Sequence, residues 1–342
     1  MKKFITSTLI LASSGIAFGS AEDGIIDTDT TWTGSEISIT SPLTISSETT
    51  FTIGDGVNKS TYNVSGVDAP VANSGKIIVS ENSELYIKST VIKSGVTAVS
   101  TGKIDVYGTL KLYTSAQAAN HEITDANVYG SLLVEKGTLQ LLAPKSSLYL
   151  HKNSSIEMRD LYMSSSTVLK LEDNVTFGNQ SNAITLMSNQ KNMEIDASST
   201  DAKKVELKTL NFTLNNTLII KLSDQLFSVA SMNTIKGDMG SSKFILEDFK
   251  NDLFKIEDVS NISLTKDGVI SFAGKGGTLT LSAKDTDGNA INISSYDGWY
   301  FTADGFLNIA GYPISASVPE PAEWAMILGA LALGFAIYRR RK

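Results

Sequence analysis

The stretch GKIDVYGTLKLY, residues 102–113, decides how the body of this chain folds. Apolar and polar residues alternate through it, which is the two-residue period of a strand with one buried face. The inward residues are Ile104, Val106, Leu110 and Leu112, and the outward residues are Lys103, Asp105, Thr109 and Lys111. Gly108 falls on the inward parity, and we interpret it as a corner between two short strands.

Similar glycine-led strands recur along the chain. The segments GKIIV at Gly75, GKIDV at Gly102 and GSLLV at Gly130 begin 27 and 28 residues apart, and two of them continue to Gly-Thr-Leu, at Gly108 and Gly137. A near-constant period of this length indicates stacked repeats. The sequence therefore predicts an all-β fold, a right-handed parallel β-helix or β-solenoid over residues 22–199. An antiparallel β-sandwich is the alternative, because alternation does not reveal pairing direction.

The alternation of apolar and polar residues is less regular in residues 200–311, where we expect an irregular β region with capping hairpins. The segment SDQLFSVASMNTIKGDM (223–239) is interpreted as a short helix or an irregular excursion. Tight turns are expected at Asp287-Gly288 and at Asp304-Gly305. A cap is needed because an open β-coil exposes an edge that recruits other chains. Residues 312–317 are read as a linker.

The texture GxLxVxGTLxL in residues 32–180 resembles the passenger domains of autotransporters and other bacterial surface β-helices. The resemblance implies a solenoid displayed outside the cell.

The first residues have the layout of a secretory signal. Lys2 and Lys3 precede an apolar stretch from Phe4 to Phe18, which is followed by small residues. This order predicts a signal peptide over residues 1–21, a helix during export, with cleavage after Ala21.

The last residues, VPEPAEWAMILGALALGFAIYRRRK (318–342), have the layout of a membrane anchor. The apolar run 322–338 is at the lower length limit for one transmembrane helix. Trp324 and Tyr338 would lie in the two headgroup layers, and the terminal cations would stop transfer and stay in the cytoplasm. These cations are Arg339, Arg340, Arg341 and Lys342. The expected topology is a single pass through the inner membrane with the body outside the cytoplasm.

The segment before the span, Val318-Pro319-Glu320-Pro321, must be extended, because each proline fixes φ and removes an N–H. Pro-Glu-Pro followed by an apolar span and an arginine cluster resembles the PEP-CTERM sorting signal. That resemblance implies recognition by exosortase, a membrane cysteine protease, and an exported protein linked with extracellular polysaccharide and biofilm. A plain single-pass anchor with a proline-containing linker is the alternative.

The composition narrows the possible partners. The chain contains no cysteine, so disulfides and thiolate metal sites are excluded. The 29 basic residues fall to 23 without the six terminal cations, and the 36 acidic residues to 34 without Glu320 and Glu323, which leaves the body near −11. Arg159 is the only arginine in the body. Nucleic acid is therefore not an expected partner.

Little in the sequence points to a cofactor or a metal, and we expect neither. His121 and His151 are the two histidines, interpreted as surface or corner residues. The run from Asp285 to Asn289 resembles the start of a calcium loop but lacks the later ligands, so a hairpin turn is the preferred interpretation. No GxSxG element is present.

These observations predict a non-enzymatic structural or adhesive protein of the cell surface or extracellular matrix, associated with exopolysaccharide or biofilm. One alternative is a β-helix polysaccharide lyase or glycosidase, whose candidate residues are Glu157, Arg159, Asp160, Glu172 and Asp173. A second alternative is a carbohydrate-binding adhesin with an aromatic platform built from Trp299, Tyr300 and Phe301.

Overall fold

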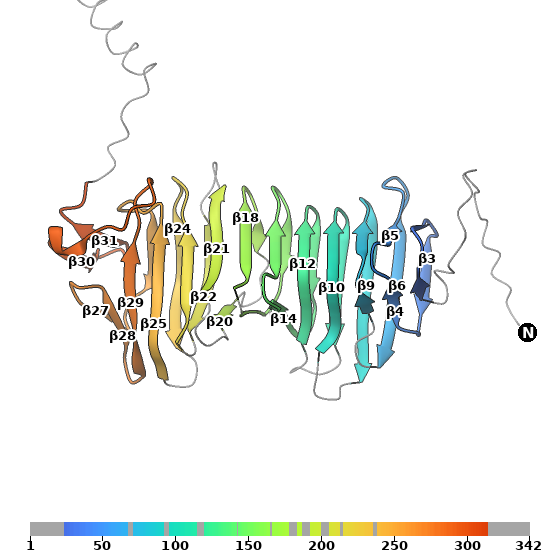
Figure 1. Cartoon of the computed structure of the whole chain (residues 1–342), viewed down its shortest axis with the longest axis horizontal. Helices are drawn as coiled ribbons and strands as arrows, with labels where there is room; N and C mark the ends of the chain where they lie inside the picture. Colours follow the sequence, from blue (N-terminus) through green and yellow to red (C-terminus); the bar gives the residue numbers. More distant parts are fainter. Residues whose placement is uncertain are drawn as a thin grey trace, which may run out of the picture.

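The computed structural model describes residues 24–67, 71–91, 96–114, 120–141, 143–164, 166–177, 183–186, 192–199, 205–212, 215–234 and 238–313. These residues form a rod of stacked β-coils, with the strands running across the long axis (Figure 1). The predicted signal helix, the cleavage site at Ala21, the transmembrane helix and the sorting segment lie outside the described residues.

Three faces surround the interior of the rod, and within each face every strand pairs in parallel with the strand of the next coil. Face I contains β1 (Ile25–Ile26), β4 (Leu43–Ile45), β7 (Val71–Asn73), the first parts of β10 (Val96–Val106) and β12 (Asn120–Val128), β14 (Thr138–Leu141), β17 (Asp160–Met163), β20 (Ala183–Leu186), β22 (Val205–Phe212), β24 (Phe227–Thr234) and β26 (Phe254–Asp258). Because β10 and β12 continue through the corner, faces I and II belong to one continuous sheet.

Face II contains β2 (Thr30–Trp32), β5 (Thr50–Ile53), β8 (Lys76–Val79), the second parts of β10 and β12, β15 (Ser147–Leu150), β18 (Val168–Glu172), β21 (Asn192–Ser199), β23 (Thr217–Lys221), β25 (Asp238–Glu247) and β29 (Gly276–Ala283). Face III contains β3 (Glu36–Ile39), β6 (Ser60–Val67), β9 (Ser83–Val91), β11 (Thr109–Thr114), β13 (Ser131–Val134), β16 (Ser155–Glu157) and β19 (Thr176–Phe177).

The prediction of an all-β solenoid is confirmed, and the pairing within the coils is parallel. The sandwich alternative required antiparallel pairing and is wrong. Alternation also identified the inner residues correctly, since Ile104, Val106, Leu110 and Leu112 are all buried. Asp105 points outward as expected but is only 6 % exposed. It is covered because Lys76 and Asn127 of the two neighbouring coils bind its carboxylate.

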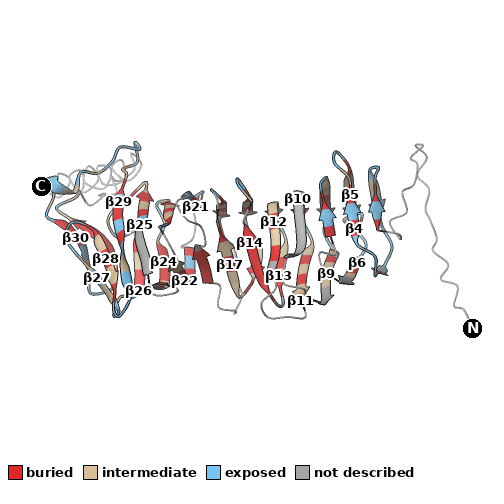
Figure 2. Cartoon of the chain, turned by 60° about the horizontal axis from the view of Figure 1, so that its bottom comes forward, coloured by how far each residue is buried: buried red, intermediate tan, exposed pale blue. Residues whose placement is uncertain are grey.

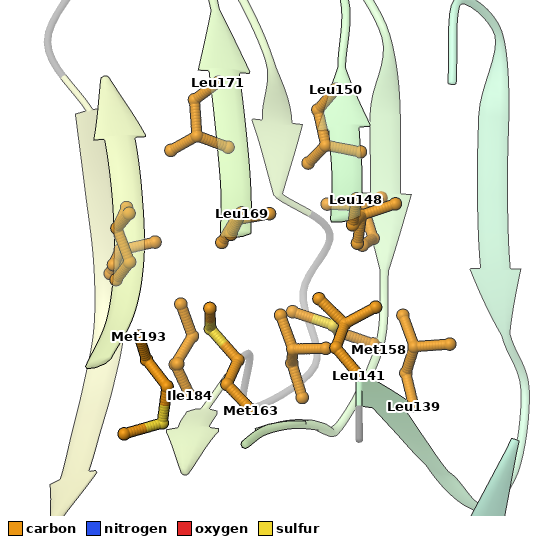
Figure 3. Close-up of a cluster of buried hydrophobic side chains, with 14 of the residues drawn as sticks. Leu139, Leu141, Leu148, Leu150, Met158, Met163, Leu169, Leu171, Ile184 and Met193 are labelled. Atoms are coloured by element: carbon orange, nitrogen blue, oxygen red, sulfur yellow. The ribbon is translucent and has the colours of Figure 1, made fainter. Parts of the chain in front are cut away.

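The core is made of columns of apolar side chains in register from coil to coil. One column on face II contains Ile77, Ile104, Ala126, Leu148, Leu169, Ile195, Ile220 and Leu246. Figure 3 shows Leu148 and Leu169 from adjacent coils in this interior, beside Met158, Met163 and Met193. Buried and less buried residues alternate along many strands (Figure 2). Each coil therefore buries its inward face against the coils beside it.

Glycines stand at corners where successive coils approach closely. A Cβ on Gly102 would lie 2.0 Å from the carbonyl oxygen of Gly75, and a Cβ on Gly130 would lie 2.1 Å from that of Gly108. The alignment from the sequence paired Gly130 with Gly102 and is wrong at this point. Gly130 begins a face III strand that stacks on the strand after Gly108. Spacing alone cannot show which face a glycine precedes.

The stack continues past residue 199. Strands β22 to β26 and β29 pair in parallel with the register of the earlier coils, and residues 227–234 form β24 instead of a helix or an excursion. The described strands from β20 to β26, together with β29, lie on faces I and II. Among the described residues of these coils, no strand pairs on face III, so the glycine-led pattern of that face is lost, although the inward residues remain buried.

Antiparallel strands cover the C-terminal end of the rod. Strands β27 (Ile262–Leu264) and β28 (Val269–Phe272) pair with each other, and β28 pairs with β29. Strands β30 (Gly298–Phe301) and β31 (Leu307–Ala310) form a hairpin, preceded by the 3-10 turn η1 (Ile293–Ser295). Gly305 has a φ of 85° in the connecting turn, as the Asp-Gly dipeptide predicts. The other predicted dipeptide, Asp287-Gly288, lies in a turn that is flanked by a single antiparallel β-bridge between Lys284 and Ala290.

Candidate functional site

The candidate site is a column of aromatic side chains at the corner between faces II and III. Tyr107, Tyr129 and His151 each follow the last inward residue of a face II strand, in three successive coils. The backbone N–H of each residue donates to the last carbonyl oxygen of the face II strand in the preceding coil, at 2.8 Å in all three cases. Parallel strands about 4.8 Å apart bring such equivalent side chains to stacking distance. We call Tyr107, Tyr129 and His151 the ring column.

The rings of this column lie nearly parallel. The centroids of Tyr107 and Tyr129 are 4.5 Å apart with an interplanar angle of 5°, and those of Tyr129 and His151 are 3.8 Å apart with an angle of 8°. The two tyrosines are 42 % and 40 % exposed, although most large apolar or aromatic side chains of the body are buried. The column therefore displays aromatic surface on the outside of a rigid stack.

Glu172 closes one end of the column. Its carboxylate accepts a hydrogen bond from the Tyr149 hydroxyl and one from the backbone N–H of Lys152 at 2.8 Å. His151 Nδ1 lies 3.5 Å from the same carboxylate, and the Tyr149 ring is 3.7 Å from the His151 ring. Lys170 Nζ lies 4.6 Å from the centroid of the Tyr149 ring. These contacts fix the orientation of the histidine.

The ionisation of these groups follows from their surroundings. Burial raises the pKa of the Glu172 carboxyl, but the hydrogen bonds from Tyr149 and Lys152 outweigh it, so the net pKa is lowered. Burial and the Glu172 charge raise the pKa of Tyr149 to about 12. Burial lowers the pKa of His151, opposed by Glu172. At neutral pH the site therefore presents neutral rings beside one carboxylate, an arrangement suited to binding.

A row of polar side chains runs beside the column on face II. Lys76 Nζ lies 2.7 Å and Lys103 Nζ 3.8 Å from the Asp105 carboxylate, and Asn127 Nδ2 donates to that carboxylate at 2.8 Å. The row continues in register through Tyr149 to Lys170. Hydrogen-bond donors and acceptors thus line the edge of the aromatic surface.

His121 is not a surface residue, so its sequence interpretation is wrong. It is fully buried on face I, in register with Leu139 of the next coil and Leu161 of the coil after it. Its Nε2 lies 3.1 Å from the carbonyl oxygen of Lys136. Burial lowers its pKa to about 4, so the ring is neutral at pH 7 and Nε2–H donates to that carbonyl. His151 is a corner residue, as expected, with a specific role in the ring column.

The five residues of the lyase or glycosidase alternative lie at different places around the coil. Glu157 ends β16 on face III, and Arg159 and Asp160, joined at 2.5 Å, lie at the corner where face I begins. Glu172 and Asp173 lie at the other corner, at the end of β18 on face II, where Glu172 holds Tyr149. The structure thus places these five residues at two corners of the coil, on opposite sides of face III.

The suggested aromatic platform at residues 299–301 does not form. Trp299 is 2 % exposed and packs edge-on against Phe249, with ring centroids 5.3 Å apart, and Phe301 packs partly against the core. Tyr300 is the exposed member of the three, at 41 %.

The segment that resembles the start of a calcium loop forms a turn. The carboxylate of Asp285 accepts hydrogen bonds from the backbone N–H groups of Asp287 and Asn289 and so closes this turn.

Two further features of the described part of the chain bear on function. Across it, no group of three or more His, Asp or Glu side chains is placed to hold a metal ion. Residues 24–313, apart from the gaps given above, contain no helix of the length and apolarity that a membrane crossing requires. The predicted transmembrane span and the sorting residues Val318 to Pro321 lie beyond this part.

The fold and the ring column define a β-solenoid with an exposed aromatic corner. The chain matches no protein-family model, no curated protein and no solved structure with which it was compared.

The ring column is not among the sites predicted from the sequence. Tyr107, Tyr129 and His151 are separated by a whole coil in sequence, so no local cluster reveals them. A signal exists, because each follows an apolar residue that closes an alternating strand, in Val-Tyr, Val-Tyr and Leu-His. It can be used only after the coils are aligned by face.

Proposed function

We propose that this chain is an exported, non-enzymatic β-solenoid that serves as a structural or adhesive component of the cell surface or extracellular matrix, in association with exopolysaccharide. The observation that carries the proposal is the exposed ring column with its polar border on face II. Neutral aromatic rings bordered by hydrogen-bonding groups suit sugar rings, which have apolar C–H faces and polar rims. Because the rings sit on a rigid stack, binding costs little ordering entropy.

In this proposal, the ends of the chain govern delivery. The signal peptide directs export and is removed after Ala21, and residues 322–338 hold the chain in the inner membrane with the body outside. An exosortase-type protease then recognises Val318-Pro319-Glu320-Pro321. The features that support delivery are the order of proline motif, apolar span and cations at one end and the signal layout at the other.

The proposal also includes the hand of the solenoid. The coil is right-handed, since nearly all connections between parallel strands of one sheet have this hand.

The delivery test is the mass of the C-terminal peptide of the protein purified from its own cells. We expect the chain to end near Pro319 to Pro321, with or without a covalent adduct, and a variant carrying Pro319→Ala and Pro321→Ala to keep Lys342 in the membrane fraction. An intact Lys342 in the unaltered protein would reduce the tail to a plain anchor.

The adhesion test is co-sedimentation of the full-length protein with exopolysaccharide from the same cells. We expect retention at physiological salt, because stacking and hydrogen bonding do not depend on net charge. If the protein stays in the supernatant at all polysaccharide concentrations, the association with exopolysaccharide is wrong.

A further inference from the structure

The ring column has one open end. Continuing the register beyond Tyr107, the equivalent positions in the two preceding coils are Ser80 and Gly54, which follow Val79 and Ile53. The Ser80 hydroxyl donates to the Gly54 carbonyl oxygen at 3.0 Å, so it is turned onto the backbone. Neither residue carries a ring that could stack on Tyr107, and the ring pairing of Tyr107 is with Tyr129 on its other face.

The two ends of the column therefore differ. At one end, His151 covers Tyr129 and is held by Glu172. At the other end, residue Tyr107 is 42 % exposed, and the ring face that does not stack on Tyr129 is directed along the rod toward the coil of Val79. Stacking on Tyr129 fixes the orientation of the Tyr107 ring. A preformed ring face of this kind needs no rearrangement before it receives a ligand.

The space that adjoins this face suits a flat ring. Successive coils are about 4.8 Å apart, and van der Waals contact between carbon atoms lies at about 3.5–4.0 Å. A ligand ring stacked on Tyr107 would take the place that an aromatic side chain of the preceding coil would occupy. Because the equivalent positions hold Ser80 and Gly54, no aromatic side chain at these positions takes that place in the two preceding coils.

Polar groups lie beside this place. Lys76 on the preceding coil and Lys103 on the same strand as Tyr107 share the carboxylate of Asp105. Two residues after Ser80, the Asn82 side chain donates to the carbonyl oxygen of Gly56 at 3.1 Å. The exposed ammonium groups of Lys76 and Lys103 are thus the hydrogen-bond donors nearest to the Tyr107 face on face II, and hydroxyl oxygens can accept from them.

From this geometry we propose that the open face of Tyr107 is a stacking subsite for one hexopyranose residue of a glycan chain, with the exposed side chains of Lys76 and Lys103 contacting its hydroxyl groups. The proposal rests on the proposed function and deepens it. A pyranose with all its hydroxyls equatorial presents axial C–H bonds on both faces, and their positive polarisation complements the negative face of the phenol ring. The equatorial hydroxyls then point outward toward the polar border.

The test uses cellohexaose, a β-1,4-linked glucose hexamer, as the probe, and the full-length protein. Binding is measured by titration with saturation-transfer NMR. We expect Tyr107→Ala to weaken binding at least fivefold, whereas Tyr107→Phe keeps it because the ring face is unchanged. Tyr300→Ala is the matched control, since Tyr300 is an equally exposed tyrosine outside the ring column. It should leave binding unchanged.

A second variant tests the position of the subsite. Ser80→Tyr adds a ring at the preceding rung, where it would stack on Tyr107 and occupy the ligand's place. We expect this variant to lose cellohexaose binding while its thermal unfolding midpoint is unchanged or raised. A variant that stays folded and still binds as the unaltered protein does would overturn the proposal.

The outcomes separate the subsite from the wider function. If the unaltered protein does not bind cellohexaose, or Tyr107→Ala binds it equally well, the subsite is wrong. If retention on the cells' own exopolysaccharide persists in either case, the proposed function stands without this subsite. If the unaltered protein is not retained on the exopolysaccharide, the proposed function is wrong, and cellohexaose binding by the unaltered protein and by Tyr107→Ala then decides the subsite separately.

Discussion

Asp252 and Asn308 exchange two hydrogen bonds that fasten the C-terminal hairpin to the solenoid. The backbone N–H of Asp252 donates to Asn308 Oδ1 at 2.9 Å, and Asn308 Nδ2 donates to Asp252 Oδ1 at 2.7 Å. Asn251 adds a bond from the backbone N–H of Ile309 to its own Oδ1 at 2.9 Å. This latch joins the loop before β26 to β31 of the cap.

Removing one side of the latch should loosen the cap. Asn308 is buried, so Asn308→Ala leaves the Asp252 N–H and carboxylate without this partner. We expect a loss of about 2 kcal/mol in the free energy of unfolding, from urea denaturation. Asn233→Ala, on the exposed side of β24, is the control and should change it by less than about 0.5 kcal/mol. Equal effects of the two variants would show that the latch adds nothing.

The close approach of Gly75 and Gly102 should make Gly102 intolerant of a side chain. In Gly102→Ala, the new Cβ would meet the Gly75 carbonyl, so two coils must separate. We expect a loss of about 2 to 3 kcal/mol. Gly56→Ala is the comparison, because Gly56 has a φ of 79° but open space around it, and it should lose about 1 kcal/mol from backbone strain alone. Urea denaturation of both variants measures the difference, and a smaller loss for Gly102→Ala would contradict the crowding.

Lys145 provides a test of corner strain in the opposite direction. It has a φ of 69° at the third position of a turn that the N–H of Ser146 closes onto the Ala143 carbonyl at 3.0 Å. Lys145→Gly should raise the free energy of unfolding by about 0.5 to 1 kcal/mol, because glycine adopts this φ without strain. The same change in strand β22, Lys208→Gly, should lower it. The thermal unfolding midpoints of the two variants should shift in opposite directions. If both midpoints shift in the same direction, strain at Lys145 is not the cause.

His121 should make the protein less stable in mild acid. Its pKa is about 4 when folded, against an ordinary value near 6.5, so the unfolded chain binds the proton more readily. Its neutral state therefore supports the fold above about pH 6.5, and the support is lost as the pH falls toward 4, by about 3 kcal/mol in all.

Replacing this histidine should remove that part of the pH dependence. His121→Leu fits a column that already contains Leu139 and Leu161. The difference in unfolding free energy between the two proteins should change between pH 6.5 and pH 4 and stay constant above pH 7. A difference that is flat across this range would show that His121 does not carry the effect.

The strand pattern was predictable because it is local. Ile104, Val106, Leu110 and Leu112 alternate with polar neighbours, and alternation depends only on the geometry of a single strand. The burial of His121 was not predictable, because its place in a column of leucines follows from strands that lie before and after it. The error at Gly130 has the same origin, since the spacing from Gly102 does not tell one corner from the next.

The sequence by itself determined that this protein is a stack of short strands with one buried side, and where several of its corners lie, because side-chain parity and turn residues act within a few positions. Only the tertiary structure decided that the pairing is parallel, that the stack continues to Ala283, and that Tyr107, Tyr129 and His151 meet in one column. Those features depend on the register between coils. Register is set by the packing of whole columns in the core, with loops of unequal length between them, and so no single stretch of the chain contains it.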